Sequence, residues 1–95
     1  MDERPLTLEL IEARHDFPGP YTFKVIGEAN AELPARVAEC VRATLGLDAP
    51  PDVSIKTAEG GRHESVTVEP TCPDAEAVLQ LYASLRELSG VRFLL

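Results

Sequence analysis

Hydrophobic residues along this chain switch between two spacings, and no other feature constrains its fold as strongly. Over residues 21–28 apolar and polar residues alternate, which is typical of a half-buried strand. Over residues 33–45 apolar residues recur at steps of three and four, which predicts an amphipathic helix that ends at Gly46. Asn30 is a suitable N-cap for this helix, whereas Pro34 favours a start a few residues later.

A hairpin is predicted in the middle of the chain. One strand is expected over residues 52–58, with Val53 and Ile55 on its apolar side, and a second over residues 63–69. The glycine pair at residues 60–61 accepts the positive φ angles of a tight turn. The two strands are therefore expected to be antiparallel neighbours.

A second helix and a last strand complete the pattern. Pro73 suits the first turn of a helix, and an apolar stripe at helical spacing runs over residues 78–88. Gly90 closes this helix, and residues 91–95 form the last strand. The predicted order of elements is strand, helix, strand, strand, helix, strand.

Right-handed connections arrange these elements in one way. We expect an α+β protein with a ferredoxin-like βαββαβ sandwich, whose four-stranded antiparallel sheet has the strand order 4-1-3-2. Both helices then cover one face of the sheet, and the other face stays open. Residues 17–95 form this single domain. Residues 1–16 form an N-terminal lead, in which Leu6–Arg14 is compatible with a short helix.

Charge and composition restrict the partners. The chain has 95 residues, enough for one domain, and nine Lys and Arg against sixteen Asp and Glu, so its net charge is −7. This surplus of negative charge disfavours nucleic acids and anionic membranes as partners. No apolar run approaches membrane-spanning length and no secretion signal is visible, so a cytoplasmic location is expected.

Residues able to carry chemistry do not assemble into a motif. Cys40 lies on an apolar helical stripe and is expected to pack as a small hydrophobic residue. Cys72 precedes a helix start, where a thiol pKa can fall, and an incidental thiol is the alternative. His15 and His63 have no metal-ligand spacing. We therefore expect no metal, no cofactor and no catalytic residue.

The open face of the predicted sheet is the first candidate site. Strand alternation places on it both lysines of the chain, an arginine, a histidine and several hydroxyls: Lys24, Lys56, Arg92, His63, Thr22, Ser54, Ser65 and Thr67. This face is hypothesised to dock an anion, an acidic protein segment or a nucleic-acid backbone. A solvated sheet that simply carries polar side chains is the alternative. RNA is disfavoured because Tyr21 and Phe23 point to the core by parity.

Three stretches of the sequence look familiar: residues 17–27 (FPGPYTFKVIG), 63–68 (HESVTV) and 91–95 (VRFLL). They resemble the YbeD family, small bacterial proteins of unknown function, and the resemblance covers about residues 17–95. It implies a ferredoxin-like fold similar to the small-molecule-sensing ACT regulatory domains, and no established activity.

The turn after the first strand is the second candidate site. By resemblance to ACT domains, small effectors bind at this turn, often at a dimer interface, which here points to Gly27, Glu28 and Asn30. A glycine permits close backbone approach, and a helix N-terminus favours an anion. A glycine that merely turns the chain is the alternative.

These observations favour a non-enzymatic regulatory or protein-interaction module. The alternative is an ACT-like small-molecule sensor that acts as a dimer, and a third class is a catalyst that uses Cys72 or His63. The expected partner is an unidentified protein or a small metabolite. A homodimer through exposed edge strands is also compatible with the sequence.

Overall fold

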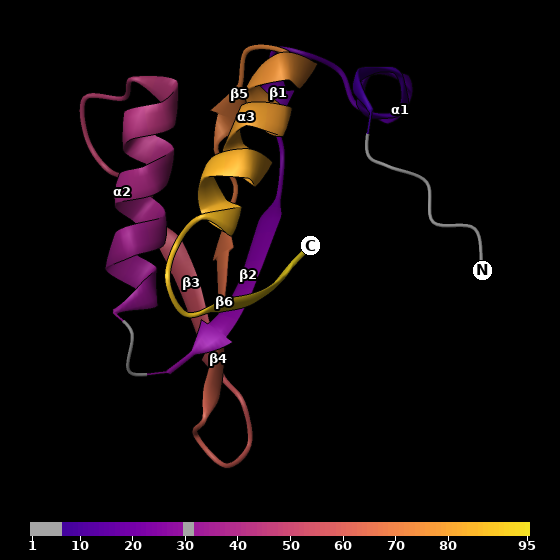
Figure 1. Ribbon diagram of the computed structural model, residues 1–95. Helices are drawn as coiled ribbons and strands as arrows, with labels where there is room; N and C mark the ends of the chain where they lie inside the picture. The colour runs from indigo at the N-terminus through magenta and orange to yellow at the C-terminus, as the bar shows by residue number, and fades with distance from the viewer. Residues whose placement is uncertain (1–6, 30–31) are drawn as a thin grey trace, which may run out of the picture.

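Figure 1 shows the computed structural model, which describes residues 7–29 and 32–95. The helices are α1 (Leu8–Arg14), α2 (Leu33–Leu45) and α3 (Ala75–Arg86). The strands are β1 (Gly19–Pro20), β2 (Phe23–Glu28), β3 (Val53–Thr57), β4 (His63–Val68), β5 (Thr71–Cys72) and β6 (Val91–Leu94). None of the described helices is long and apolar enough to cross a membrane.

The α+β class and the antiparallel sheet are confirmed. The four strands β3-β4-β2-β6 form one sheet in that order, and every neighbouring pair is antiparallel. Along the chain, these four strands are β2, β3, β4 and β6. Numbered one to four and read from the β6 edge, they have the order 4-1-3-2. The layout differs from the expectation by a second, two-stranded sheet, in which β1 pairs with β5 and Gly19 lies opposite Cys72.

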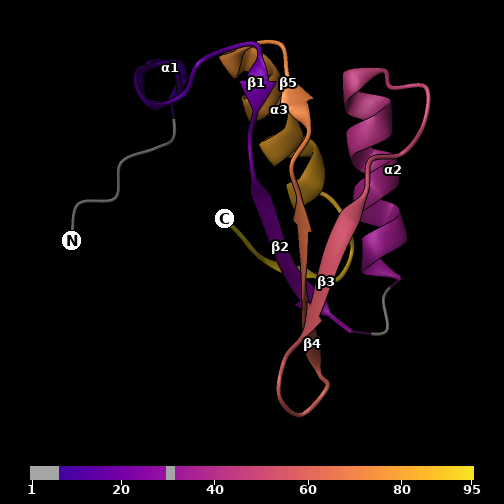
Figure 2. The same cartoon turned by 180° about the vertical axis from the view of Figure 1, so that it is seen from behind.

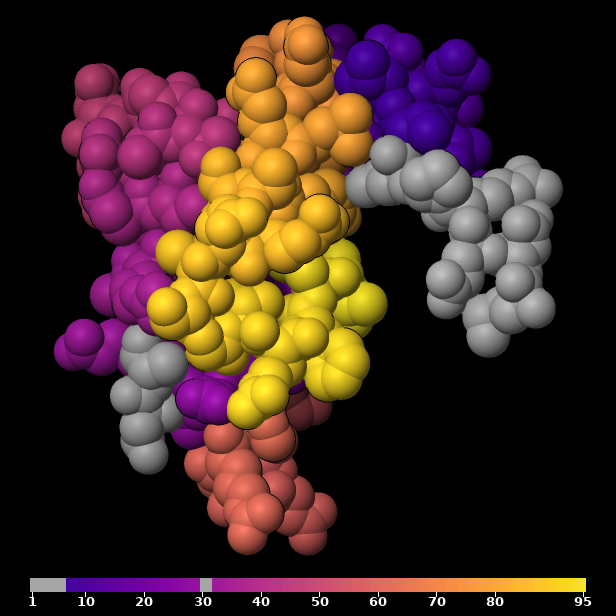
Figure 3. Space-filling model, in the orientation of Figure 1, coloured from indigo at the N-terminus to yellow at the C-terminus, as the bar shows by residue number. Residues whose placement is uncertain are grey.

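Two layers build the main body of the molecule. Both α2 and α3 lie on the same side of the four-stranded sheet, and the view from behind shows its strands uncovered (Figures 1 and 2). The two helices fill the front of the molecule side by side (Figure 3). The fully buried core residues come from both layers: Phe23, Val25, Val66 and Val68 from the sheet, and Leu33, Val37, Val41, Val78, Leu81 and Leu85 from the helices. Burying each such side chain stabilises the fold by about 1.5–3 kcal/mol.

The predicted ends of the first long helix are confirmed in part. The C-cap of α2 is Gly46, which adopts the left-handed conformation with φ 68°. At the other end α2 begins at Leu33, with Pro34 in its first turn, as the proline favours. The residue before it, Glu32, has φ 54° and provides no side-chain cap. The predicted N-cap, Asn30, lies outside the described residues.

The predicted start of the second long helix is wrong by two residues. Asp74 is the N-cap of α3, and its carboxylate accepts a hydrogen bond from the backbone N–H of Ala77 at 2.8 Å. Pro73 therefore precedes the helix. The helix also ends at Arg86, so Leu88 belongs to the following turn and packs on the core from there.

The short helix α1 lies within the predicted N-terminal lead. Thr7 caps it by accepting a hydrogen bond from the Leu10 N–H at 3.3 Å. Its one buried residue is Ile11, only 2% exposed, which joins the hydrophobic core. The helix lies against α3. One apolar side chain thus attaches this part of the lead to the domain.

The edge strand β3 is less buried than its sequence pattern suggests. Ile55 pairs with Val66, which is fully buried, so both side chains are on the helix-covered side of the sheet. Ile55 nevertheless remains 54% exposed because it lies at the sheet edge. The prediction of its side is thus confirmed.

Candidate functional site

The open face is the side of the four-stranded sheet that carries no helix. Cross-strand register gives it two central rows, one of Lys24, Thr67 and Ser54, the other of Ile26, Ser65 and Lys56. His63 lies opposite Glu28 at one end of these rows. The polar residues that alternation assigned to this face on β2, β3 and β4 therefore lie on it together.

The two lysines are the distinctive groups of the open face. Lys24 and Lys56 are both exposed, and the side chain of neither has a hydrogen bond or ion pair with the described residues. They lie two strands and one row apart, which puts their Cα atoms roughly 12 Å from each other. Two ammonium groups at this separation can each bind a separate carboxylate.

The third predicted cation of this face is already paired. The Arg92 guanidinium donates a hydrogen bond to the Glu28 carboxylate at 2.6 Å, and both side chains are about half exposed. Such an exposed ion pair contributes at most about 1 kcal/mol. It locally neutralises Arg92, so this residue differs from the two lysines, which the sequence pattern could not show.

An apolar corner of the open face was missed by sequence reasoning. The register of β6 shifts beside β2, so that Gly27 pairs with Val91 and Ile26 pairs with Phe93. The shift turns Phe93 onto the open face, where it is 65% exposed beside the half-buried Ile26. Leu95 pairs with Lys24 through two backbone hydrogen bonds and is 64% exposed. The only sequence signal was Ile26, an apolar residue at an outward position.

The predicted effector turn is tightly packed at its glycine. Gly27 is buried, and a Cβ atom built on it would press on the Gly90 carbonyl oxygen and lie 2.7 Å from Cδ2 of Leu33. Glycine is required here by close packing against a neighbouring segment. Glu28 forms an ion pair with Arg92, and Asn30 lies outside the described residues. The described part of the turn thus favours the structural alternative for Gly27.

Neither cysteine has the surroundings of a reactive thiol. Burial raises the pKa of the Cys72 thiol, and the nearby Asp74 carboxylate raises it further. Burial also raises the pKa of Cys40, although a hydrogen bond with Thr44 opposes this. A raised pKa leaves less thiolate, the nucleophilic form. Among the described residues no group of three or more His, Cys, Asp or Glu is arranged to hold a metal ion.

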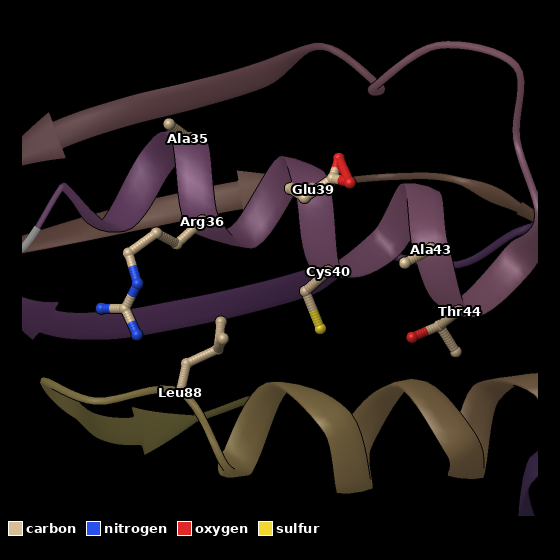
Figure 4. Close-up of a pocket in the computed structure, with 7 residues that line it drawn as sticks. All are labelled: Ala35, Arg36, Glu39, Cys40, Ala43, Thr44 and Leu88. Carbon is tan, nitrogen blue, oxygen red and sulfur yellow. The ribbon is translucent and has the colours of Figure 1, made fainter.

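A shallow groove lies along the other side of the molecule. It has a volume of about 450 Å³ and runs between α2 and the turn after α3, with Cys40 facing Leu88 across it (Figure 4). Arg36 lies at one end, where its guanidinium donates a hydrogen bond to the Ser89 carbonyl oxygen at 2.8 Å. The groove is mostly apolar and offers few groups to orient a ligand.

Comparison with known proteins places the chain in a family. A family described as proteins of unknown function (DUF493) matches residues 12–95, so the chain belongs to it. Among its relatives, a UPF0250 protein of Shewanella piezotolerans is 36% identical over 77 residues, which cover 81% of this chain and 85% of that protein. A UPF0250 protein of Vibrio vulnificus is 37% identical over 80 residues, 84% of this chain and 85% of that protein. Membership of a small, YbeD-like family of unknown function is thereby confirmed.

Proposed function

We propose that this protein is a non-enzymatic, cytoplasmic interaction module with a ferredoxin-like fold, whose open face docks an acidic segment of a partner protein. The carrying observation is that Lys24 and Lys56, both lysines of the chain, project from the open face. Neither has a carboxylate partner among the described residues. In a chain of net charge −7, such a placement puts two cations on the same face of the sheet.

Charge complementarity defines the occupant. Carboxylates of a docked segment would pair with the two lysines, while the hydroxyls of Ser65 and Thr67 between them accept or donate further hydrogen bonds. These charged contacts set the rate and specificity of association more than its affinity. The affinity therefore requires apolar contact as well.

The apolar corner supplies that contact. Phe93 on β6 and Leu95 just after it are each about two-thirds exposed, and they lie next to Ile26 and Lys24 on β2. Large aromatic residues dominate interface energies when a partner covers them. The fitting partner is thus an acidic segment that carries at least one large apolar side chain.

The alternative is that this protein is an ACT-like sensor, which binds a small molecule and acts as a dimer. Packing of Gly27 against Gly90 and Leu33 leaves no space at that glycine for a ligand. We therefore favour the open face. A metabolite that raises the unfolding temperature of the purified protein, in the absence of peptide binding, would support the sensor instead.

Selection from a random peptide library tests the proposal. Peptides selected by the wild-type protein should be rich in Asp and Glu and contain an aromatic or large aliphatic residue. The double variant Lys24→Glu/Lys56→Glu should lose them, with binding weakened by roughly 100-fold. The control Arg62→Glu/Arg86→Glu makes the same change in net charge at two exposed arginines away from the open face and should bind normally.

Two outcomes would contradict the proposal. Selected peptides without acidic residues would show that the lysines do not choose the partner. Equal loss of binding in the open-face and control variants would show that only overall charge matters. In either case the open face would be a solvated sheet surface.

A further inference from the structure

The outer edge of β3 carries, at regular positions, backbone groups that have no partner in the described part of the chain. The Ala58 N–H donates to the His63 carbonyl oxygen, which marks a hydrogen-bonded pair in register with the β3–β4 ladder. By alternation, Ser54 and Lys56 also bond to β4. The N–H and C=O groups of the odd-numbered residues, Val53, Ile55 and Thr57, therefore point away from the sheet.

The opposite edge of the sheet is irregular. Between its pairs with β2, β6 contains one extra residue, Arg92, and this register shift interrupts the ladder. Bulges of this kind protect an edge from pairing with another chain. No register shift interrupts β3, and no proline lies within it. Of the two edges, β3 is the one suited to accept a strand.

Ile55 marks the centre of this edge. Its side chain is on the helix-covered side of the sheet, yet 54% of it is exposed. A neighbouring strand at the usual spacing of about 4.8 Å would cover it. The exposed apolar surface and the unsatisfied backbone groups thus occur at the same residue.

A second copy of β3 fits this edge in a self-complementary register. If two antiparallel β3 strands pair about a two-fold axis at Ile55, Ile55 faces its own copy and Val53 faces Thr57. Each of these is a hydrogen-bonded pair, so the outward groups of all three residues are satisfied on both strands. The two Ile55 side chains then contact each other.

The charged residues Asp52 and Lys56 are compatible with this two-fold register. Lys56 lies opposite Ser54 of the second copy, and Asp52 lies two residues further along that copy. This diagonal neighbour is within reach of a lysine side chain. Neither Asp52 nor Lys56 has an ion-pair partner among the described residues. The symmetry forms the pair twice, and no like charges face each other directly.

We propose that two copies of this chain associate through β3, with Ile55 on the two-fold axis and reciprocal Lys56–Asp52 ion pairs, into a continuous eight-stranded sheet. Because the axis is perpendicular to the sheet, the open faces of both copies lie on one side of the dimer. Five paired residues bury less than a standard interface of about 1,600 Å², so the dimer is weak. This inference does not depend on the proposed function, and in the dimer Asp52 of the second copy competes with a docked carboxylate for Lys56.

Sedimentation equilibrium of the purified protein over about 10 μM to 1 mM tests the inference in the range expected of small interfaces. The wild-type protein should shift from monomer to dimer in this range. Ile55→Glu should weaken the association by at least about tenfold, because two carboxylates would meet on the axis. The control Phe93→Glu alters an even more exposed apolar residue at the opposite edge and should leave the association unchanged.

A charge swap tests the register itself. Asp52→Lys and Lys56→Asp should each weaken the dimer by roughly tenfold, since each replaces both ion pairs by repulsion. The double variant should restore it, which a general loss of folding cannot do. A wild-type monomer at every concentration would overturn the inference. A dimer disrupted by Phe93→Glu and not by Ile55→Glu, or one that the double variant fails to restore, would also overturn it.

Discussion

Replacement of Gly27 by alanine is the sharpest test of how the first strand is packed. The new methyl group would meet two neighbours, the Gly90 carbonyl oxygen and, at 2.7 Å, Cδ2 of Leu33. Leu33 can move slightly, but the Gly90 carbonyl is held in place because it accepts a hydrogen bond from the Glu28 N–H at 3.0 Å. The clash therefore has to be relieved by shifting backbone.

The magnitude follows from three effects. Overpacking costs about 1–3 kcal/mol, and weakening the Glu28–Gly90 hydrogen bond costs about 1 kcal/mol more. Alanine also lowers the conformational entropy of the unfolded chain, which stabilises the folded state by about 0.4–1 kcal/mol. We expect Gly27→Ala to lower the free energy of unfolding by about 1–3.5 kcal/mol. For a domain of this size that corresponds to a drop in Tm of roughly 4–28 °C.

Urea unfolding followed by circular dichroism measures the effect. The control is Gly60→Ala, in a turn where no atom lies within 4 Å of the new Cβ and only the left-handed φ of 91° opposes it. It should cost about 1–2 kcal/mol by conformation alone. A Gly27→Ala protein within about 0.5 kcal/mol of wild type would refute the packing argument.

A double-mutant cycle separates the two contacts of the new methyl group. Leu33→Ala removes the side chain that meets the Gly27→Ala methyl group. The two changes together should therefore cost about 1 kcal/mol less than the sum of each alone. If the losses of unfolding free energy of the two single variants add up to that of the double variant, only the Gly90 carbonyl clashes with the new methyl group.

Two further predictions concern titratable side chains in the core or packed against it. Burial raises the pKa of the Tyr82 hydroxyl above its ordinary value of 10.0, and its hydrogen bond with Tyr21 adds to this. The folded state therefore binds the Tyr82 proton more tightly than the unfolded state, so stability is full below about pH 10 and falls above it. Urea unfolding between about pH 8 and 11 should show this loss of stability, and Tyr82→Phe should remove most of it. If the free energy of unfolding of Tyr82→Phe falls with pH as steeply as that of the wild type, the assignment to Tyr82 is wrong. A thiol reagent should modify the partly exposed Cys40 before the fully buried Cys72, and Cys40→Ala should leave only the slow reaction; equal rates would contradict the burial of Cys72.

Most of the fold was predictable because its signals are local. Alternation over residues 21–28 and a helical stripe over residues 33–45 each depend on which side chains one core can bury. The glycine pair at residues 60–61 has φ angles of 91° and 73°, as the hairpin prediction required. Once these elements and their order are known, chain connectivity leaves few arrangements of the sheet.

Errors occurred where two local rules compete, or where the deciding contact leaves no local pattern. Pro73 is compatible with a first helical turn, but the Asp74 side chain supplies the cap and the helix starts after it. The two-residue strands β1 and β5 have no periodicity to detect. Ile55 has the pattern of a buried strand residue, and only its place at the sheet edge leaves it exposed.

By itself, the sequence determined the order of the four longer strands and the two long helices, the apolar faces of these elements and the side of the sheet on which Lys24 and Lys56 lie, since parity and helical spacing are properties of the local backbone. Only the tertiary structure decided that Arg92 is paired with Glu28, that Phe93 lies on the open face and that Gly27 is closed by Gly90. These three facts depend on the register between β2 and β6 and on the approach of a segment more than sixty residues away along the chain. Strand register is set by the packing of the whole sheet, which no local pattern contains.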